Sequence, residues 1–517
     1  MLTTETLKPE ISAIKPDRLP ALRRKTRERM NEPVNLASSR TGRMLTAIEA
    51  IPNLESMDAD GLEKSVALYF EKARFVDKGL TPEKIEAVVR YATGEGIDAE
   101  DREISPIPSD ITERMDALEA FEASGEEAYV ATVNIGGSNT TANLTTVKDG
   151  KITLKNSQNL SFRNEKEREG TPIQCIDHLD FWRRVIPSDF LQALKELTTD
   201  DLNNMAIEFA IPFPIKDGHV IHCSDKVACN KNPLGPLNDR EARKGEGTYP
   251  NITQSVLEFL RTEGINLISD KTHTGDNDTI NGALGMYQEA SRILDEKGAV
   301  GFVICGTGFN IAIFKKVANA DGTYSIKGYN LEMGHFRPEE PCALDVDVNA
   351  QAKTVDDIES CVSGKNLGNV FKMALTELTN PNSGLRKFID NLSKDDANEM
   401  IFRFGIDETP LEGQQFNALT ENEKTLLKIV CKQFVERVII YFLAVFQGIS
   451  ASTGHDAVFL KEGSVFDKNP KLVAEINRRA GRGIISMATP KTEGMTPSSS
   501  GAVFDALAKS KIAEGAN

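Results

Sequence analysis

Positive charge is scarce in this chain. Its 517 residues include 61 Lys and Arg against 77 Asp and Glu, which gives a formal net charge of -16. A protein whose main partner is the phosphate backbone of a nucleic acid normally carries a basic face. The charge balance therefore argues against nucleic acid as the main partner, although backbone N–H groups can still hold a small anion in a local pocket.

Disulfide and zinc signatures are also missing. No Cys-x-x-Cys pair occurs, and an odd number of cysteines is a poor disulfide framework. We expect reduced thiols in a cytoplasmic protein. The polar start, MLTTETLKPE, lacks the apolar core of a secretory signal. The seven cysteines lie at positions 175, 223, 229, 305, 342, 361 and 431.

Long apolar runs are absent as well. The most apolar run, Val438–Phe446, is too short to span a bilayer. It lies within the helical pattern of Thr425–Gly448, which predicts a buried core helix and no membrane span. Residues 1–60 contain few large apolar residues, so we expect a flexible extension, with a docking or targeting role as the alternative. The remaining length is sufficient for two lobes with a cleft between them.

Strand and helix patterns alternate along most of the chain, which indicates an α/β protein. An Asp149-Gly150 turn joins two predicted strands within 142–155. Helices are predicted over 62–75, 81–96, 177–185, 188–197 and from Ile280, and strands over 128–137, 205–214, 266–270, 299–308 and 456–464, with a hairpin that ends at 329–336.

Two glycine turns, each between a pair of predicted strands, are candidate phosphate sites. Residues 133–139 read VNIGGSN and residues 305–310 read CGTGFN. Without Cβ atoms the backbone can approach a ligand closely and direct its N–H groups at phosphate oxygens. Each turn taken alone is also consistent with a plain hairpin. Two further candidates precede predicted helices, at 461–464 (KEGS) and 498–501 (SSSG).

The candidate acid–base group lies in residues 275–279, GDNDT, at the start of a predicted helix. A carboxylate there is favoured in its ionised form by the positive end of the helix, and it can accept a proton from a substrate hydroxyl. Simple N-capping by Asn or Asp is the alternative. Glu332 and Glu359 lie in apolar or glycine-containing settings and are candidate ligands for vicinal hydroxyls, with a surface or capping role as the alternative.

Taken in order, these pieces resemble the hexokinase family, within the actin–Hsp70–sugar kinase superfamily. The resemblance extends from about residue 60 to the end and includes a short loop, SPIPSD, before the first strand. The family's motifs are matched by NIGGSN and CGTGFN at the phosphates, FAIPFP at the sugar loop, NDT at the base, NLEMGHF and IESCVSGKNLG at the sugar, and LKEGSVFDKNP at the adenosine; SSSGAV resembles the family's closing motif.

This resemblance implies a two-lobed, actin-like (ribonuclease H-like) sugar kinase fold with a central interdomain cleft. It implies a hexokinase of the glucokinase type, which phosphorylates the 6-hydroxyl of a hexose, with glucose as the expected sugar, in the first step of glycolysis. ATP would be the donor and Mg²⁺ its metal. The predicted lobes are a small one (126–276 plus 496–517) and a large one (61–125 plus 277–495).

The resemblance also implies residue roles, carried over position by position. Asp278 would be the general base on the sugar hydroxyl. The sugar would be bound by Asn277, Asn310, Glu332 and Glu359, together with the approximate match Ser224 and Lys226. The phosphates would be held by Gly136, Gly137, Ser138, Asn139, Gly306, Thr307 and Gly308, and the adenosine by Gly463 and Ser464. No side chain is predicted as a direct metal ligand.

Four positions depart from the family pattern. Asn134 replaces the Asp that helps to hold magnesium, and Thr141 replaces an Arg; Pro212 and Asn281 replace a Ser and a Gly. A catalytically weak sugar-binding or regulatory protein is therefore the alternative function, and an actin-like filament former a third. The EMGH sequence around His335 also resembles bacterial ROK sugar kinases, but their cysteine-rich zinc motif is missing.

Overall fold

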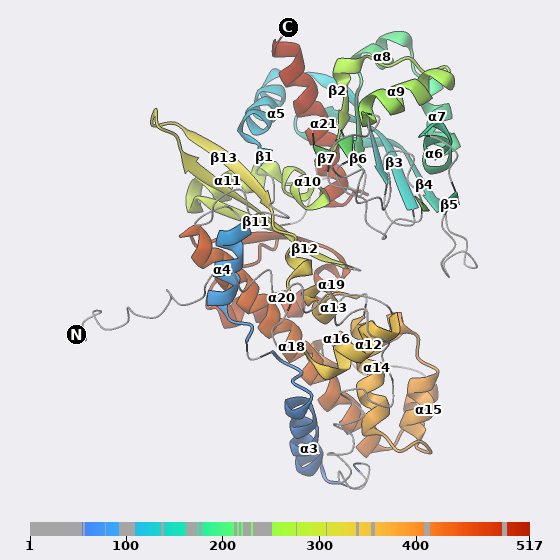
Figure 1. Cartoon of the computed structure of the whole chain (residues 1–517), viewed down its shortest axis with the longest axis vertical. Coiled ribbons are helices and arrows are strands. Elements are labelled where there is room, and N and C mark those ends of the chain that lie inside the picture. The colour runs from blue at the N-terminus through green and yellow to red at the C-terminus, as the bar shows by residue number, and fades with distance from the viewer. Residues whose placement is uncertain are drawn as a thin grey trace, which may run out of the picture.

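The computed structural model contains two five-stranded mixed sheets, one in the upper part of Figure 1 and one near its centre, and a helical part below them. We call these the first sheet and the second sheet. The structure describes residues 54, 57–77, 79–92, 109–135, 139–161, 173–174, 178–210, 215–216, 219–220, 229–230, 251–275, 277–306, 308–337, 341–352, 357–364, 366–407, 414–488 and 494–516.

The first sheet has the strand order β10-β6-β2-β3-β4. Strands β2, β3 and β4 form an antiparallel meander, and β6 and β10 extend it in parallel. The predicted Asp149-Gly150 turn is confirmed, since both residues have positive φ (50° and 67°), as a tight hairpin requires. The strands are β2 (Glu127–Ile135), β3 (Asn139–Lys148), β4 (Lys151–Ser161), β6 (Ala206–Ala210) and β10 (Thr272–Thr274).

Helices cover both faces of the first sheet. On one face, an apolar cluster joins the sheet to three helices, and the Trp182 indole donates to Ser255 Oγ at 2.8 Å. On the other face, Val503 and Leu507 pack against Val130. The first three helices are α6 (His178–Val185), α7 (Ser188–Lys195) and α9 (Ile252–Thr262); α5 (Thr112–Ser124) and α21 (Pro497–Ala516) cover the other face.

The second sheet has the order β1-β13-β12-β11-β14. Strands β11, β12 and β13 form an antiparallel meander, which confirms the hairpin predicted up to residue 336, and β14 joins β11 in parallel. The strands are β1 (Ser109–Asp110), β11 (Ala299–Cys305), β12 (Phe309–Ala318), β13 (Tyr324–Asn330) and β14 (Val458–Glu462). One face packs on α10 (Asp278–Leu284) and α11 (Tyr287–Lys297).

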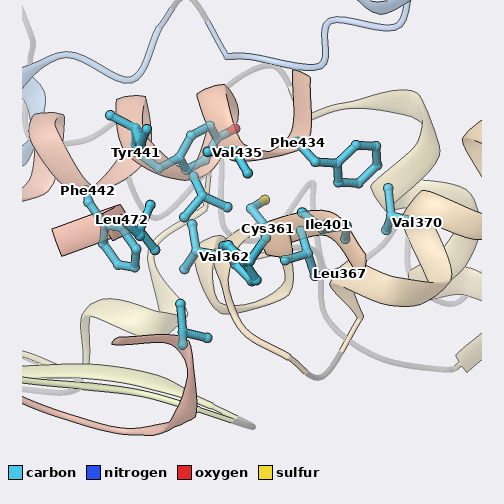
Figure 2. Close-up of a cluster of buried hydrophobic side chains, with 14 of the residues drawn as sticks. Cys361, Val362, Leu367, Val370, Ile401, Phe434, Val435, Tyr441, Phe442 and Leu472 are labelled. Carbon is cyan, nitrogen blue, oxygen red and sulfur yellow. The ribbon is translucent and has the colours of Figure 1, made fainter. Parts of the chain in front are cut away.

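The other face of the second sheet packs on the helical part, where α18 (Glu421–Thr453) is the central helix. Thr420 and Glu423 form a capping box at its start, and Gly454 ends it with a φ of 69°. Apolar side chains of α18, such as Phe434 and Phe442, pack in one cluster with Val362 and Leu367 (Figure 2). The predicted helix over Thr425–Gly448 is confirmed and is longer than the pattern indicated.

The rest of the helical part surrounds α18. Among the described residues, no helix combines the length and the apolar composition needed to cross a bilayer. Its elements include α3 (Ala59–Lys72), α4 (Pro82–Ala92), α12 (Ala343–Ala352), α13 (Ile358–Val362), α14 (Leu367–Leu378), α15 (Gly384–Asp390), α16 (Lys394–Phe402), α17 (Gln414–Asn417), α19 (Ser464–Asp467) and α20 (Pro470–Ala480).

Two details differ from the predicted elements. The strand predicted over 266–270 is wrong, because residues 269–271 form a 3-10 turn and the strand starts at Thr272, after it. Helix α5, assigned by sequence to the large lobe, contacts both sheets: Leu118 packs with the first sheet and Met115 with the second. The division of the chain into lobes stays a prediction.

Helices α10 and α21 join the two sheets (Figure 1). They cross at very close range, since a Cβ atom added at Gly501 would lie 1.5 Å from the Asn281 carbonyl oxygen. Likewise, a Cβ at Gly285 would lie 1.9 Å from the Pro497 carbonyl oxygen. Only glycine allows this approach. Because α10 begins with Asp278, the predicted base lies on the helix that connects the two sheets.

Candidate active site

The start of α10 carries two of the predicted site residues. Asn277 is the N-cap, and its Oδ1 accepts a hydrogen bond from the Thr279 backbone N–H at 2.9 Å. The capping alternative considered for this segment therefore holds for Asn277. Since the oxygen is engaged in the cap, the amide nitrogen is the group with which Asn277 can bind a ligand.

Asp278 is exposed to solvent, yet protein atoms surround its carboxyl group closely enough to change its acidity. Desolvation raises the pKa of Asp278 above its ordinary value, and the negative charge of Glu332 raises it further. A hydrogen bond from Thr279 Oγ1 to Asp278 Oδ1, at 3.2 Å, acts in the opposite direction. The result is a stronger proton acceptor than an ordinary Asp, at a position that a ligand can reach.

A chain of hydrogen bonds connects Asp278 to Glu332. Asn310 Nδ2 donates to Thr279 Oγ1 at 2.8 Å and to Asn330 Oδ1 at 2.9 Å. Asn330 Nδ2 in turn donates to Glu332 Oε1 at 2.7 Å. The Ile311 backbone N–H donates to Asn310 Oδ1 at 2.7 Å, which fixes the orientation of this amide. The structure thus brings Asp278, Asn310 and Glu332 together, as the resemblance implied.

Glu332 has an unusual backbone conformation. Its φ and ψ of 46° and 39° lie in the left-handed region, which costs a residue other than glycine on the order of 1 kcal/mol or more. Its backbone N–H donates to Asn330 Oδ1 at 3.3 Å, so the same amide that holds the carboxylate also holds this turn. Strain of this kind is frequent where a side chain must be directed at a ligand.

Glu359 lies in the first turn of α13, beside the same strands. Its Oε2 accepts a hydrogen bond from the Phe309 backbone N–H at 3.3 Å. A Cβ atom added at Gly308 or Gly334 would lie 3.1 Å or 3.4 Å from this oxygen, so both glycines leave room for the carboxylate. Glu359 is therefore held next to Asn310, at the end of the second sheet where Asn330 and Glu332 also lie.

Three turns converge next to these carboxylates. Gly463 follows β14 with a φ of 108°, and a Cβ atom there would lie 2.3 Å from the Cys305 carbonyl oxygen. A Cβ atom at Gly306 would lie 3.7 Å from the Ser464 backbone nitrogen. The Gly364 N–H donates to the Gly306 carbonyl oxygen at 2.7 Å. Two turns predicted separately for phosphate and adenosine, at 305–308 and 463–464, thus lie side by side.

Several predicted residues lie outside the described residues, or only their backbone is described. Asn139 is placed by its backbone, as the first residue of β3. Asn134 and Thr141 are opposite each other in the β2–β3 ladder, directly before and after the first glycine turn. The predicted residues outside the described part are Gly136, Gly137, Ser138, Ser224, Lys226 and Thr307, and the departure Pro212 is outside it too.

Sequence reasoning missed three participants: Thr279, Asn330 and Glu462. Glu462 ends β14, and its Oε2 accepts hydrogen bonds from Ser498 N at 2.8 Å and Ser498 Oγ at 2.5 Å. Burial raises the pKa of Glu462, and the charge of Asp278 adds to this effect. A polar residue at the end of an apolar strand was the available signal for Asn330 and Glu462. Thr279 belongs to the NDT motif, but the sequence analysis gave it no role of its own.

A surface hollow of about 550 Å³ lies away from this group, near the C-terminal ends of α11 and α18. It is lined by Lys297, Ser450, His455 and other residues, none of which belongs to the predicted site. Among the described residues, no group of three or more His, Cys, Asp and Glu side chains has a geometry that would hold a metal ion. The hydrogen-bonded group around Asp278 therefore remains the candidate site.

Comparison with known proteins agrees with this geometry. Residues 300–482 match a family model described as hexokinase, and this range contains Asn310, Glu332 and Glu359. Over these residues, the chain resembles the hexokinase family in sequence. Asn277 and Asp278 lie just outside the matched range. No curated protein matches the chain by sequence.

Solved hexokinase structures share its fold at low sequence identity. A hexokinase from Schistosoma mansoni, in complex with glucose, is 14% identical with a TM-score of 0.56, and the match covers 86% of this chain and 99% of that one. A second crystal structure of a hexokinase is 12% identical with a TM-score of 0.52, with coverages of 88% and 97%. The two-lobed, actin-like sugar kinase fold is thereby confirmed.

Proposed function

We propose that this protein is an ATP-dependent hexose 6-kinase of the hexokinase family, with glucose as the expected substrate, which acts in the cytoplasm at the first step of glycolysis. The observation that carries the proposal is the hydrogen-bond chain that joins the raised-pKa carboxyl of Asp278 to Asn310 and Glu332. This arrangement places a proton acceptor and ligands for hydroxyl groups in one rigid network.

The polar groups of the site match the chemistry of a sugar. Carboxylates accept hydrogen bonds and do not donate them, and both amide hydrogens of Asn310 are already directed at Thr279 and Asn330. The oxygens of Glu332, Glu359 and the Asn310 amide can accept further hydrogen bonds, which suits a ligand with several donors. A hexose presents several adjacent hydroxyl groups, each with one donor, and so fits such a set.

The role proposed for Asp278 follows from its pKa. A general base works best when its pKa approaches the operating pH, and desolvation moves the Asp278 carboxyl in that direction. In phosphoryl transfer the protein mainly positions the reactants and neutralises charge, because the transition state is loose. Asp278 would accept the proton of the sugar hydroxyl, while Glu332 and Glu359 would hold the ring in place.

The residues also fit a nucleotide with its magnesium. Gly306 leaves its backbone accessible where three turns converge, as a phosphate-binding site requires, and Gly463 allows its turn to pack closely against Cys305. Gly306, Gly308, Gly463 and Ser464 would hold the nucleotide, and magnesium bound to it would neutralise phosphate charge.

A coupled assay of ADP release tests the proposal directly. Glucose, mannose, fructose and glucosamine, each offered with Mg–ATP, differ at one or two positions, so their relative rates define the substrate. We expect hexose-dependent ADP release with at least one of them. No release with any hexose, together with hexose binding by calorimetry, would instead support the alternative of a sugar-binding regulator, which Asn134 and Thr141 favour.

The reaction rate should fall at acidic pH, and this fall, the acid limb of the pH profile, should occur at a higher pH than the ordinary pKa of an aspartate would give. Asp278 works only when ionised, so activity is lost as pH falls through its raised pKa. The limb in kcat/KM is therefore expected above about pH 4, the ordinary range of an aspartate. Since Glu332 contributes to the shift, Glu332→Gln should move the limb to lower pH. A limb that stays in place in this variant would contradict the coupling of the two carboxyls.

Asn330→Ala should raise the KM for the hexose about 5-fold, because Asn310 and Glu332 both lose the amide that holds them. Asp278 keeps its contact with Thr279, so kcat should change less than KM. Asn319→Ala is the matched control, since Asn319 lies at the opposite end of the same β12–β13 hairpin and bonds Thr323. Equal KM values in the two variants would remove Asn330 from the site.

Asn134→Asp should lower the magnesium concentration needed for half-maximal rate at fixed ATP. Magnesium prefers anionic oxygen, and Asn supplies only a neutral one. Thr141 lies opposite Asn134 in the β2–β3 ladder, where the family pattern has an Arg. The natural turn therefore lacks one negative and one positive charge, and the two replacements are expected nearly to offset each other. Titration of magnesium in both proteins tests this. Identical curves and identical turnover would show that position 134 does not face the metal.

A further inference from the structure

Four charged side chains from three elements meet beneath the segment that leads to Asp278. We call them the buried charge cluster: Glu208 on β6, Arg114 on α5, and Asp505 and Lys509 on α21. The Glu208 and Asp505 carboxylates are fully buried. Arg114 Nη1 donates to Asp505 Oδ1 at 2.9 Å, Lys509 Nζ donates to Asp505 Oδ2, and Lys509 Nζ lies 3.5 Å from Glu208 Oε2.

The cluster is balanced in charge, which is the condition for burying ions at all. Burial alone would raise the pKa of Asp505, but the charges of Lys509 and Arg114 hold it at about 2. The neighbouring His273, in contact with Ser510, has its pKa lowered to about 4 by burial and by Lys509, so it adds no charge at neutral pH. Asp505 thus forms ion pairs with Arg114 and Lys509, and Lys509 also lies beside the Glu208 carboxyl.

The cluster holds the chain on both sides of Asp278. Before it, Lys509 Nζ donates to the Thr274 carbonyl oxygen at 2.8 Å. After it, Asn281 Nδ2 donates to Glu208 Oε1 at 3.3 Å. Between them, a Cβ atom at Gly275 would lie 2.6 Å from Glu208 Oε1, so the backbone there lies directly on this carboxylate. Neither Glu208 nor Lys509 has a contact with Asp278 itself among the hydrogen bonds of the described residues.

Buried ion pairs of this kind add little net stability but have strict geometry. A second fully buried pair, Arg437 with Asp345, lies in the helical part and has no contact with α10. The charge cluster differs from it in one respect: its partners are the backbone and side chain of the segment 274–281, which carries the predicted base. Position, not stability, is what this cluster supplies to the site.

We infer that Glu208 and Lys509 are positioning residues for the reaction, which hold segment 274–281 and thereby direct Asp278 at the substrate hydroxyl. The inference rests on the proposed kinase function. Neither side chain touches the reacting atoms; they act through Thr274, Gly275 and Asn281. It also assigns a purpose to Asn281, which departs from the glycine of the family pattern and supplies the amide that binds Glu208.

The test compares Lys509→Met with the matched control Arg437→Met, since each change leaves one buried carboxylate without its cation. We expect Lys509→Met to lower kcat at least ~10-fold, while hexose affinity by calorimetry stays within about twofold. Arg437→Met should lower Tm comparably and leave kcat of the folded protein unchanged. Lys509→Arg should restore most of kcat. Glu208→Gln, which keeps the shape of the side chain, serves as the second variant if Lys509→Met fails to fold.

Two readouts separate this inference from the proposed function. In the Asp278→Asn background, Lys509→Met should cause no further loss of kcat, because the base that it positions is already removed. Hydrogen exchange of the 274–281 amides should be faster in Lys509→Met and unchanged in Arg437→Met. If the natural protein phosphorylates no hexose, the proposed function fails, and hydrogen exchange alone then tests the positioning role. Equal exchange rates of these amides in Lys509→Met and Arg437→Met would overturn that role. An equal fall of kcat in both variants also overturns it.

Discussion

Asp278→Asn is expected to reduce hexose-dependent turnover at least ~100-fold while hexose affinity stays within a few-fold. The amide keeps the size of the side chain and can still accept the hydrogen bond from Thr279 Oγ1. It cannot accept the proton of the sugar hydroxyl. The loss should therefore appear in kcat, measured by ADP release, and not in the dissociation constant measured by calorimetry.

Asp60→Asn is the control for this variant. Asp60 also lies in the first turn of a helix, α3, but it is exposed and pairs with Lys64 far from the site. Its replacement should leave kcat unchanged. A near-normal kcat in Asp278→Asn would show that Asp278 is not the base. A parallel loss of hexose affinity and kcat would assign Asp278 to binding alone.

Glu332→Gln and Glu359→Gln are each expected to weaken hexose affinity by roughly 5- to 15-fold. Each change replaces a charged acceptor by a neutral one; a hydrogen bond to a charged group contributes roughly 1.5–3 kcal/mol and a neutral one roughly 0.5–1.5 kcal/mol, so about 1–1.5 kcal/mol is lost. The effect of Glu332→Gln should be the larger, because a left-handed backbone and the Asn330 amide both direct this carboxylate. Titration calorimetry with the hexose measures both.

Glu377→Gln is the matched control for these two variants. Glu377 is half-buried, like Glu359, and also accepts a hydrogen bond, from the Tyr69 hydroxyl at 2.5 Å, but it lies on α14 away from the site. Its replacement should leave hexose affinity unchanged. Unchanged affinity in Glu332→Gln and Glu359→Gln as well would remove both carboxylates from the sugar site and leave the proposal without its ligands.

Local sequence patterns determined most of the elements of this protein. Apolar alternation was sufficient for β2, a continuous apolar run for β11, helical periodicity for α18, and Asp149-Gly150 for a tight hairpin, because each depends on neighbouring residues only. The strand predicted over 266–270 failed for the same reason. Its sequence is apolar enough for a strand, but pairing with β6 begins only at Thr272. Where a strand starts depends on its partner, which the local pattern does not contain.

Motif order along the chain also indicated the resemblance to hexokinases and the candidate site residues Asp278, Asn310, Glu332 and Glu359. Only the tertiary structure decided what holds them. Thr279 and Asn330 complete a hydrogen-bond chain whose members come from α10, β12 and β13. Glu208, Asp505 and Lys509 meet although about 300 residues separate the first from the last. Pairings at such separations follow from how the sheets and helices pack, and local sequence carries no signal for them.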